Sequence, residues 1–250
     1  MTIEVKNLTL AYGEFRALDD LSVNIASNSI VGLIGPNGAG KSTLFSVVSG
    51  FIKPLAGHVT FHGQGLHGMP AFERARLGLC RTFQVPREFR QLTVLDNMLA
   101  APRDQAGESL WSLFVHRAKV AAEEDELRER AHQWLDFLRL GPVAMQPAGA
   151  LSGGQKKLLE LGRILMLKPR CVLLDEPYAG VNPVLIEQIS ERIQELHAQG
   201  IGFVIVEHNL HMLAKLSSTL VVMDRGRLLA QGAPAAVMAD ERVRDAYMGA

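Results

Sequence analysis

Apolar residues follow different periods along the chain. Around Ile3–Leu10 and again around Leu21–Ile25 they alternate with polar residues, which predicts half-buried strands. Residues 30–34 form a compact apolar run that predicts a buried strand, and residues 44–48 place their apolar side chains on one helical face. A glycine-rich loop at 35–40 lies between them. The first part of the chain is therefore predicted to be mostly strand, with one helix directly after the glycine-rich loop.

The second half of the chain alternates helical and strand patterns. Pro169 and Gly200 interrupt the patterns at two of the boundaries. The predicted order is helix 153–167, strand 171–174, helix 184–198, strand 201–206, helix 209–216 and strand 219–223. Because short apolar strands that alternate with helices are typical of parallel sheets covered on both faces, we expect an α/β core.

Between these two parts, residues from about 92 to 140 follow a helical period. One apolar face is formed by Leu127, Ala131, Trp134, Leu135 and Leu138. The acidic run 123–126 stands one turn before Arg128 and Arg130, which indicates a solvated outer face. Gly141 ends the pattern. We therefore expect a helical insertion of about 85–150 in the α/β core.

The composition is that of an ordinary folded protein, with 48% of the 250 residues hydrophobic and 21% charged. The 26 Lys and Arg residues balance 26 Asp and Glu residues, which argues against a general nucleic-acid binder. Apolar stretches such as 201–206 are shorter than the ~18–20 residues that cross a bilayer. The N-terminus lacks a signal-peptide pattern, and two cysteines are too few for a disulfide scaffold, so we expect a reducing cytoplasm.

The glycine-rich loop is the strongest candidate for chemistry. Residues 35–42 match the phosphate-loop pattern G-x-x-x-x-G-K-[ST] in full, between a predicted strand and a predicted helix. Glycines let backbone N–H groups approach phosphate oxygens, and the positive end of the helix points at the same anion. We expect Lys41 to meet the β- and γ-phosphates and Ser42 to bind Mg²⁺. The candidate nucleotide-binding residues are Gly35, Pro36, Asn37, Gly38, Ala39, Gly40, Lys41, Ser42 and Thr43.

A second glycine pattern, Gly63–Gly68, matches the dinucleotide fingerprint G-x-G-x-x-G, and Glu88 follows at about the expected distance. The strand-like segment before it is short and polar, so a turn explains these glycines better. His58 and His62 share a face of that segment, but no third ligand accompanies them, which argues against a metal site.

Two carboxylates follow the predicted strand at 171–174. Asp175 and Glu176 are expected at the carboxyl end of a sheet strand, where open α/β sheets bind ligands. Asp175 suits Mg²⁺, and Glu176 suits general-base activation of water. The alternative is a structural pair before Pro177, but the phosphate loop favours the functional interpretation. Ser152–Gln155 opens another helix and offers either a second anion site or only a helix cap.

These motifs, in this order, resemble those of the ATP-binding subunits of ABC transporters, over essentially the whole chain. Gly35–Thr43 resembles the family's Walker A motif, Leu151–Gln155 its signature sequence and Val172–Glu176 its Walker B motif. The resemblance implies a single ABC ATPase domain at 1–250. Its fold would be an α/β P-loop NTPase core with a mostly parallel sheet, an N-terminal antiparallel β subdomain and a helical insertion.

The same resemblance implies how the chain is divided. Residues 1–84 and 169–250 would form the catalytic core with the β subdomain, and residues 85–168 would form the helical subdomain, including the signature sequence. The long segment after the glutamine loop also carries Trp111 and Phe114 at helical spacing with Ala118. This apolar face suits packing better than a contact with a membrane subunit.

The resemblance implies roles for individual residues as well. Tyr12 matches the position whose ring stacks on adenine, and Gln84 matches the glutamine that senses Mg²⁺ and the attacking water. His208 matches the histidine that contacts the γ-phosphate. The implied catalytic residues are Glu176, His208, Gln84 and Lys41, and the implied Mg²⁺ ligands are Ser42, Gln84 and Asp175.

Members of the family close head to tail as dimers, which implies that a second ABC ATPase subunit, identical or related, completes each site. The residues that would bind the ATP of the partner chain are Ser152, Gly153, Gly154 and Gln155. Asn182 departs from the common pattern, because many ABC ATPases have Asp at this position.

A finer resemblance is to the ATPases of branched-chain amino-acid importers. It is carried by residues 81–84, 92–97, 176–183, 207–209 and 246–249. It implies an ATP-hydrolysing subunit for branched-chain or other hydrophobic amino acids, and the long segment 85–150 favours the longer of the two ATPases. Alternatives are the ATPase of a lipopolysaccharide exporter, that of a urea or amide importer, and a soluble ABC ATPase unconnected with transport.

The implied partners are two integral membrane permease subunits and, indirectly, a substrate-binding protein, and the implied location is the cytoplasmic face of the cell membrane. Residues 73–90 add a local feature, because five arginines stand against two glutamates there. This surplus of positive charge fits either a solvated face or a docking surface for a membrane subunit.

Overall fold

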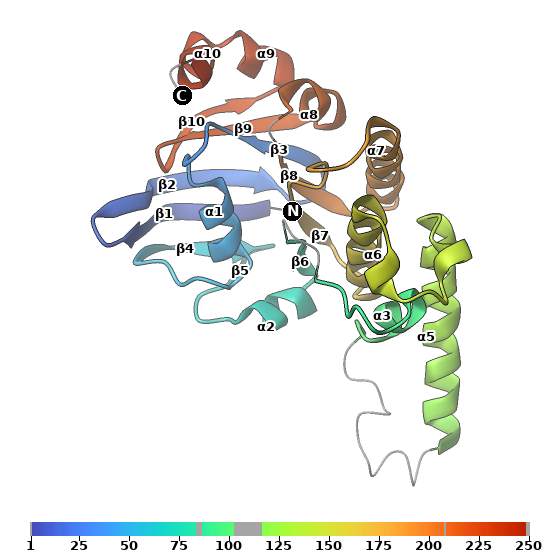
Figure 1. Cartoon of the computed structure of the whole chain (residues 1–250). Helices are drawn as coiled ribbons and strands as arrows, with labels where there is room; N and C mark the ends of the chain where they lie inside the picture. Colours follow the sequence, from blue (N-terminus) through green and yellow to red (C-terminus); the bar gives the residue numbers. More distant parts are fainter. Residues whose placement is uncertain (1, 84–86, 103–116, 208, 249–250) are drawn as a thin grey trace. The chain divides into compact units, whose positions relative to one another are not determined.

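The structure is a computed structural model, and it describes residues 2–83, 87–102, 117–207 and 209–248 (Figure 1). The chain divides into two compact units, which are described separately. Unit 1 comprises Met1–Gln84, Pro169–Ala179 and Ile193–Ala250, and unit 2 comprises Val85–Lys168 and Gly180–Arg192. Among the described residues, no helix is long and apolar enough to cross a membrane.

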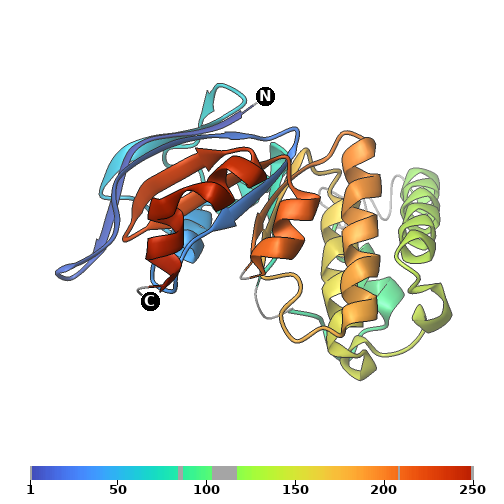
Figure 2. The ribbon, with the colours of Figure 1, turned by 90° about the horizontal axis from the view of Figure 1, so that it is seen from above.

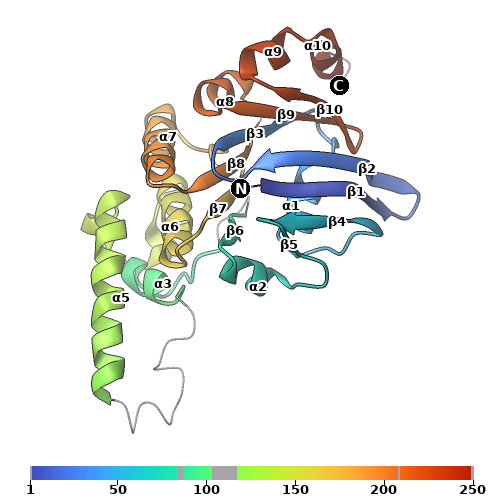
Figure 3. The same cartoon turned by 180° about the vertical axis from the view of Figure 1, so that it is seen from behind.

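Unit 1 begins with a four-stranded antiparallel sheet in the order β2-β1-β4-β5 (Figure 3). Its strands are β1 (Thr2–Tyr12), β2 (Phe15–Ala26), β4 (Ala56–Phe61) and β5 (Gln64–Gly65). Ile3 and Val5 are buried, as their alternation predicts, and so are Leu8 and Leu10 after a register shift of β1 against β2. The antiparallel β subdomain is therefore confirmed. The glycine pattern Gly63–Gly68 forms the β4–β5 turn and the residues after it, which confirms the prediction of a turn.

A second, six-stranded sheet of unit 1 has the order β10-β9-β3-β8-β7-β6. Its strands are β3 (Ile30–Ile34), β6 (Leu79–Arg81), β7 (Cys171–Asp175), β8 (Gly202–Val206), β9 (Thr219–Asp224) and β10 (Arg227–Gly232). All neighbours pair in parallel except β9 and β10, which are antiparallel. The mostly parallel α/β core is confirmed, and β3, which leads into the glycine-rich loop, lies between β8 and β9.

The strands of this sheet are apolar throughout because both faces are covered. Alternate residues such as Val31 and Leu33 join the core that includes α1 (Lys41–Val48) and the antiparallel sheet. On the other face, Leu213 of α8 (Leu210–Leu216) packs so close to Gly32 that an added Cβ would lie 2.7 Å from its side chain. Unit 1 also contains α2 (Ala71–Arg76), α9 (Pro234–Ala239) and α10 (Glu241–Met248), of which α9 and α10 lie at the top of Figure 1.

Unit 2 is helical, and its α5 and α6 run side by side (Figure 2). Its elements are α3 (Val94–Leu99), α5 (Arg117–Phe137), the 3₁₀ turns η2 (Gly141–Val143) and η3 (Ala148–Ala150), α6 (Gly153–Met166) and the first part of α7 (Pro183–Ala198). The apolar face predicted on α5 is confirmed, since Leu127, Ala131 and Leu135 are buried.

The helical pattern at 92–140 is not one continuous helix. Helix α3 ends at Leu99, and Ala100–Pro102 lies outside any helix. Thr93 caps the start of α3, because its hydroxyl accepts a hydrogen bond from the Asp96 N–H at 3.0 Å. The local cap therefore fixes where α3 begins, which the periodicity alone does not. Trp111 and Phe114 lie outside the described residues.

Candidate functional site

The glycine-rich loop joins the end of β3 to the start of α1, as its sequence predicts. Gly40 caps α1 with φ +95°, a backbone conformation that favours glycine. A Cβ at Gly40 would lie 2.4 Å from the carbonyl oxygen of Ala17, so any larger residue would displace the neighbouring strand. The first turn of α1 therefore presents its free N–H groups to the loop, which is the geometry of an anion site.

Lys41 is buried inside this loop, with 7% of its surface exposed. Its Nζ donates hydrogen bonds to the carbonyl oxygens of Gly35 at 2.7 Å and Pro36 at 2.9 Å. Burial lowers the pKa of Lys41, whereas the charges of Glu176 and Asp175 act in the opposite direction. The ammonium and the two carboxylates thus form one electrostatic cluster at the carboxyl end of the parallel sheet.

The two carboxylates follow β7, and their environments differ. Asp175 is buried, and its Oδ2 accepts a hydrogen bond from Nη2 of Arg81 at 2.7 Å. Glu176 has φ +49°, which is uncommon for a residue with a side chain. Such backbone outliers cluster at functional sites, where the surrounding structure holds them in place. Glu207 provides part of that support here, because its Oε1 accepts a hydrogen bond from the Tyr178 N–H at 2.7 Å.

A pocket of about 210 Å³ brings these parts of unit 1 together. Its lining comprises Tyr12, Phe15, Ala17, the loop residues Asn37, Gly38, Ala39 and Gly40, then Lys41, Ser42, Thr43 and Glu176. Tyr12 and Phe15 are paired across the β1–β2 turn and are 53% and 61% exposed. The lining of the pocket therefore combines two exposed aromatic rings with a phosphate-binding loop, which suits the base and the phosphates of a nucleotide.

The predicted signature residues lie in unit 2, where they start α6. Ser152 accepts a hydrogen bond from the Gln155 N–H at 3.3 Å, and Gln155 Oε1 accepts one from the Ser152 N–H at 2.9 Å, which forms a capping box. Gly154 is buried, and a Cβ there would lie 1.8 Å from the side chain of Leu185. Position 154 therefore requires glycine, because α7 approaches it closely. Ser152 and Gly153 are exposed.

Unit 2 has its own pocket of about 520 Å³ at this helix start. Its lining includes Ser152, Gln155 and Asn182. Asn182 Oδ1 accepts a hydrogen bond from the Leu185 N–H at 2.9 Å and so caps α7. Asn and Asp serve this purpose equally well, so the capping role of position 182 is kept by Asn.

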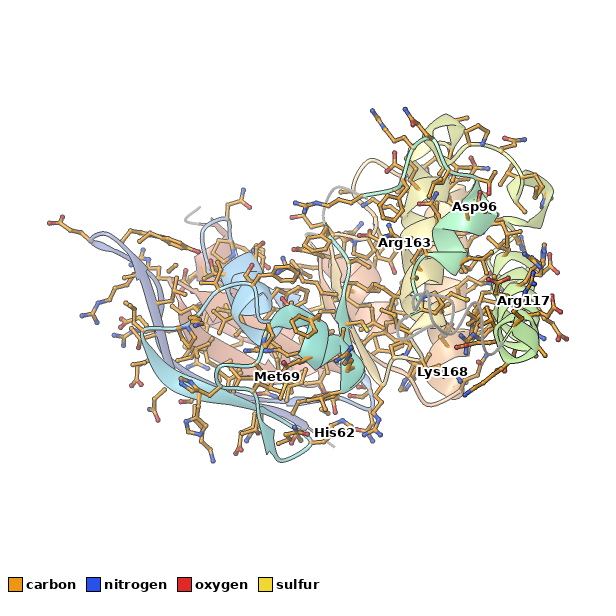
Figure 4. The ribbon with its side chains drawn as sticks, turned by 90° about the horizontal axis from the view of Figure 1, so that it is seen from below. His62, Met69, Asp96, Arg117, Arg163 and Lys168 are labelled. Atoms are coloured by element: carbon orange, nitrogen blue, oxygen red, sulfur yellow. The ribbon has the colours of Figure 1, made fainter. Side chains whose placement is uncertain are left out.

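The basic stretch at 73–90 is not one solvated face. Arg74 and Arg81 are buried or nearly so, and both make hydrogen bonds within unit 1. In unit 2, Glu88 pairs with Lys156 at 3.0 Å, and Arg163, marked in Figure 4, donates to the Arg87 carbonyl oxygen at 2.6 Å. The docking role of the exposed arginines stays a prediction.

Gln84 and His208 lie outside the described residues, so their predicted roles stay predictions. The remaining proposed metal ligands, Ser42 and Asp175, supply a hydroxyl and a carboxylate, which are hard oxygen donors of the kind that Mg²⁺ prefers. Within the described part of the chain, no group of three or more His, Cys, Asp or Glu side chains could hold a metal ion. The hydroxyl of Ser42 and the carboxylate of Asp175 fit the oxygen preference of Mg²⁺.

Sequence reasoning missed three residues of unit 1 that bear on the site. Phe15 faces the pocket beside Tyr12, Arg81 contacts Asp175, and Glu207 holds the turn after Glu176. Phe15 could have been found, because two aromatic residues flank the two-residue turn Gly13-Glu14. The contacts of Arg81 and Glu207 depend on strand order, which no local pattern reveals.

Fold and site together define a nucleotide-binding α/β protein with a phosphate loop. Residues 18–179 match the family model described as "ABC transporter", and residues 227–250 match that of the "Branched-chain amino acid ATP-binding cassette transporter". The chain belongs to the ABC transporter family. The predicted resemblance to its ATP-binding subunits is confirmed.

Several curated proteins are similar over 99% of this chain. The probable branched-chain amino acid transport ATP-binding protein LivG of Methanocaldococcus jannaschii is 38% identical over 97% of its own length. The high-affinity branched-chain amino acid transport ATP-binding protein LivG of Escherichia coli is 34% identical, and BraF of Pseudomonas aeruginosa is 32% identical, each over 97% of its length.

Solved structures agree with this assignment. A nucleotide-free ATP-binding cassette from an ABC transporter superposes with a TM-score of 0.85 at 36% identity, and the match covers all of both chains. The ADP conformation of an ATP-binding cassette of an ABC transporter superposes with a TM-score of 0.84 at 37% identity, again over both whole chains. The ABC ATPase fold is therefore established for this chain.

Proposed function

We propose that the chain is the ATP-binding and ATP-hydrolysing subunit of a transporter that imports branched-chain or other hydrophobic amino acids. The observation that carries ATP hydrolysis is the unit 1 pocket, which combines the phosphate loop, Lys41 and Glu176. The substrate class is supported by the full-length similarity to proteins named for branched-chain amino acid transport.

In this proposal the phosphates lie against the loop and the N-terminus of α1. The N–H groups of Gly38–Thr43 donate to phosphate oxygens, and Lys41 turns from the carbonyl oxygens of Gly35 and Pro36 to the β- and γ-phosphates. Tyr12 stacks on the adenine, and Phe15 extends the same apolar surface. The phosphates thus replace carbonyl oxygens as partners of a lysine that is already in place.

Glu176 acts as the general base in the proposed reaction. Its carboxylate accepts a proton from water, the water oxygen attacks the γ-phosphorus in line, and the bond to the ADP oxygen breaks. Lys41 stabilises the charge that develops on the transferred phosphoryl group. Gln84 orients the water, and His208 contacts the γ-phosphate, as the family resemblance implies.

We propose Ser42, Asp175 and Gln84 as the residues that hold Mg²⁺. The ion, when bound, neutralises charge on the β- and γ-phosphate oxygens. Asp175 is suited to this position because it is buried at the carboxyl end of β7, with its main-chain N–H bonded to the Thr82 hydroxyl at 3.1 Å.

We further propose that two such cassettes form a head-to-tail dimer. Residues 1–84 and 169–250 then serve as the catalytic core with the β subdomain, and residues 85–168 serve as the helical subdomain, in which Ser152–Gln155 bind the ATP of the partner chain. Support comes from the start of α6, where Ser152 and Gly153 are exposed. The dimer would act at the cytoplasmic face of the membrane with two permease subunits and a substrate-binding protein, and co-purification in detergent tests this assembly.

The hydrolytic role is tested by Glu176→Gln. We expect the variant to bind ATP with nearly wild-type affinity and to lose turnover by about 100-fold or more, because the amide cannot accept the proton. Nucleotide binding by fluorescence and phosphate release measure the two effects. Steady-state hydrolysis near the wild-type rate would show that Glu176 is not the base.

A further inference from the structure

Arg81 connects the two elements that carry the proposed metal ligands. It ends β6, and its side chain is 9% exposed. Its Nη2 lies 2.7 Å from Oδ2 of Asp175, at the end of β7, and its Nη1 lies 2.9 Å from the hydroxyl of Ser46, on α1. The guanidinium also packs 5.7 Å from the ring centre of Phe45, a second residue of α1.

The Ser46 end of this connection continues to the phosphate loop. The Ser46 hydroxyl donates a hydrogen bond to the Ser42 carbonyl oxygen at 2.7 Å, one helical turn earlier. The chain of contacts therefore runs from the Asp175 carboxylate through Arg81 and Ser46 to the main chain of Ser42. The rigid planar fork of a guanidinium can fix such a spacing, whereas the ammonium of lysine provides a single point charge.

Next along the chain, Thr82 supports the main chain of Asp175. Its hydroxyl oxygen accepts a hydrogen bond from the Asp175 N–H at 3.1 Å. Two successive residues at the end of β6 thus hold the side chain and the main chain of Asp175. The side chain is 6% exposed, so its direction is set by these contacts rather than by solvent.

We propose that Arg81 is a positioning residue that fixes the spacing of Ser42 and Asp175 and so selects Mg²⁺ over larger divalent cations. The inference rests on the proposed function of this site. Mg²⁺ demands near-ideal octahedral geometry at 2.0–2.1 Å, whereas Ca²⁺ accepts irregular shells at 2.3–2.6 Å. A loosened pair of ligands therefore disfavours Mg²⁺ more than Ca²⁺.

A purely electrostatic role of Arg81 makes a different prediction. Removing a positive charge beside Asp175 would strengthen the binding of both cations alike. Arg81→Lys separates the two roles, because it keeps the charge but cannot reach Asp175 and Ser46 together. Ser46→Ala, at a half-buried position, removes the hydrogen bonds of Ser46 with Arg81 and with Ser42 but leaves the contacts of Arg81 with Phe45 and Ser49, so it serves as a milder second variant.

The test is the divalent-cation dependence of binding of a fluorescent ADP analogue, which involves no turnover. For Arg81→Lys we expect the Mg²⁺ concentration at half-saturation to rise about tenfold, as for other residues that support metal ligands, and the Ca²⁺ value to change much less. For Ser46→Ala the Mg²⁺ concentration at half-saturation should also rise, but by less. The matched control is Arg242→Lys, which alters an exposed Arg–Asp pair of the same 2.7 Å separation.

The positioning role would be overturned if the half-saturating concentrations of Mg²⁺ and Ca²⁺ rose equally, or if neither variant changed them. Thermal unfolding shows whether Arg81→Lys is folded, and Ser46→Ala carries the test if it is not. Wild-type protein that binds ADP without any divalent-cation dependence would refute the proposed metal site itself, and the inference with it. The expected result is a half-saturating concentration that rises much more for Mg²⁺ than for Ca²⁺, with the ADP affinity in the absence of metal unchanged.

Discussion

Burial changes the chemistry of several single residues in unit 1, and Cys171 shows this most directly. It starts β7 with no exposed surface, beside Cys80 of β6. Burial, and to a smaller extent the neighbouring Cys80, raises the pKa of the Cys171 thiol to about 12. Both cysteines are free thiols, as their number predicts, and the deprotonated form of Cys171 is excluded from the folded protein at neutral pH.

The raised pKa of Cys171 predicts a loss of stability at alkaline pH. An unfolded thiol ionises near its ordinary pKa of about 8.5. The contribution of the buried neutral thiol to the free energy of unfolding is therefore complete below that pH, and it is lost as the pH rises towards 12. In this window wild-type protein should lose about 1 kcal/mol per pH unit more than Cys171→Ala. Urea unfolding of both proteins between pH 8 and 11 measures the difference, and parallel curves would contradict it.

At the residue scale, the candidate site was predictable where chemistry follows from a contiguous motif. The phosphate-loop pattern predicts the position of Lys41. The run of apolar residues that ends before Asp175 predicts that Asp175 and Glu176 lie at the end of a buried strand. Arg81 was grouped with the surface charges instead. Its partner Asp175 is distant in the sequence, and only the pairing of β6 with β7 brings them together.

At the scale of elements, Arg74 links α2 to the end of the phosphate-loop helix. Its Nη1 donates to the carbonyl oxygens of Val47 at 2.7 Å and Val48 at 2.8 Å, in the last turn of α1. Its other nitrogens donate to the carbonyl oxygens of Leu66 and of Met69, which is marked in Figure 4. The guanidinium is buried, and this lowers the pKa of Arg74. It therefore adds a charged donor to the last carbonyl groups of α1, of which that of Val47 also accepts a hydrogen bond from the Gly50 N–H at 3.1 Å.

We expect Arg74→Met to destabilise the protein by about 3 kcal/mol, because several buried carbonyl groups would lose their only charged donor. The matched control is Arg76→Met, two residues later on α2 at an exposed position, which should cost less than about 0.5 kcal/mol. Chemical denaturation of the two variants and the wild type makes the comparison. Similar losses in both would mean that Arg74 contributes only as a surface charge.

Most long elements were predictable from periodicity, and short ones were not. Helices α6 and α7 and strands β7, β8 and β9 agree with their predicted ranges to within about two residues, as is usual for element boundaries. Strand β6 has three residues and α2 has six, which is too short for a period to develop. These elements form because tertiary contacts, such as those of Arg74 and Arg81, hold them.

At the scale of the whole molecule, the proposed dimer places the two anion-binding helix starts of one chain in different active sites. A variant of the phosphate loop and a variant of the signature sequence then damage different halves of a site. Lys41→Ala and Ser152→Arg should each abolish most hydrolysis when pure. In a mixed dimer one site receives both defects and the other receives neither.

An equal mixture of Lys41→Ala and Ser152→Arg is therefore expected to recover about a quarter of the wild-type rate, since half of the dimers are mixed and one of their two sites is intact. Phosphate release after subunit exchange measures the recovery. Lys41→Ala mixed with Glu176→Gln is the control, because both changes lie in the unit 1 part of a site and no intact site can form. Absence of recovery in the first mixture would count against a site shared by two chains.

The position of β3 has a consequence for how the protein is made. The strand that precedes the phosphate loop pairs only with β8 and β9 in the sheet, and both follow it by most of the length of the chain. A nascent chain that ends before β8 carries the complete phosphate-loop sequence but neither neighbour of the strand that holds it. We therefore expect that ATP in the cell does not stabilise the first half of the protein on the ribosome, and that the nucleotide pocket forms only after β9 has emerged, late in synthesis.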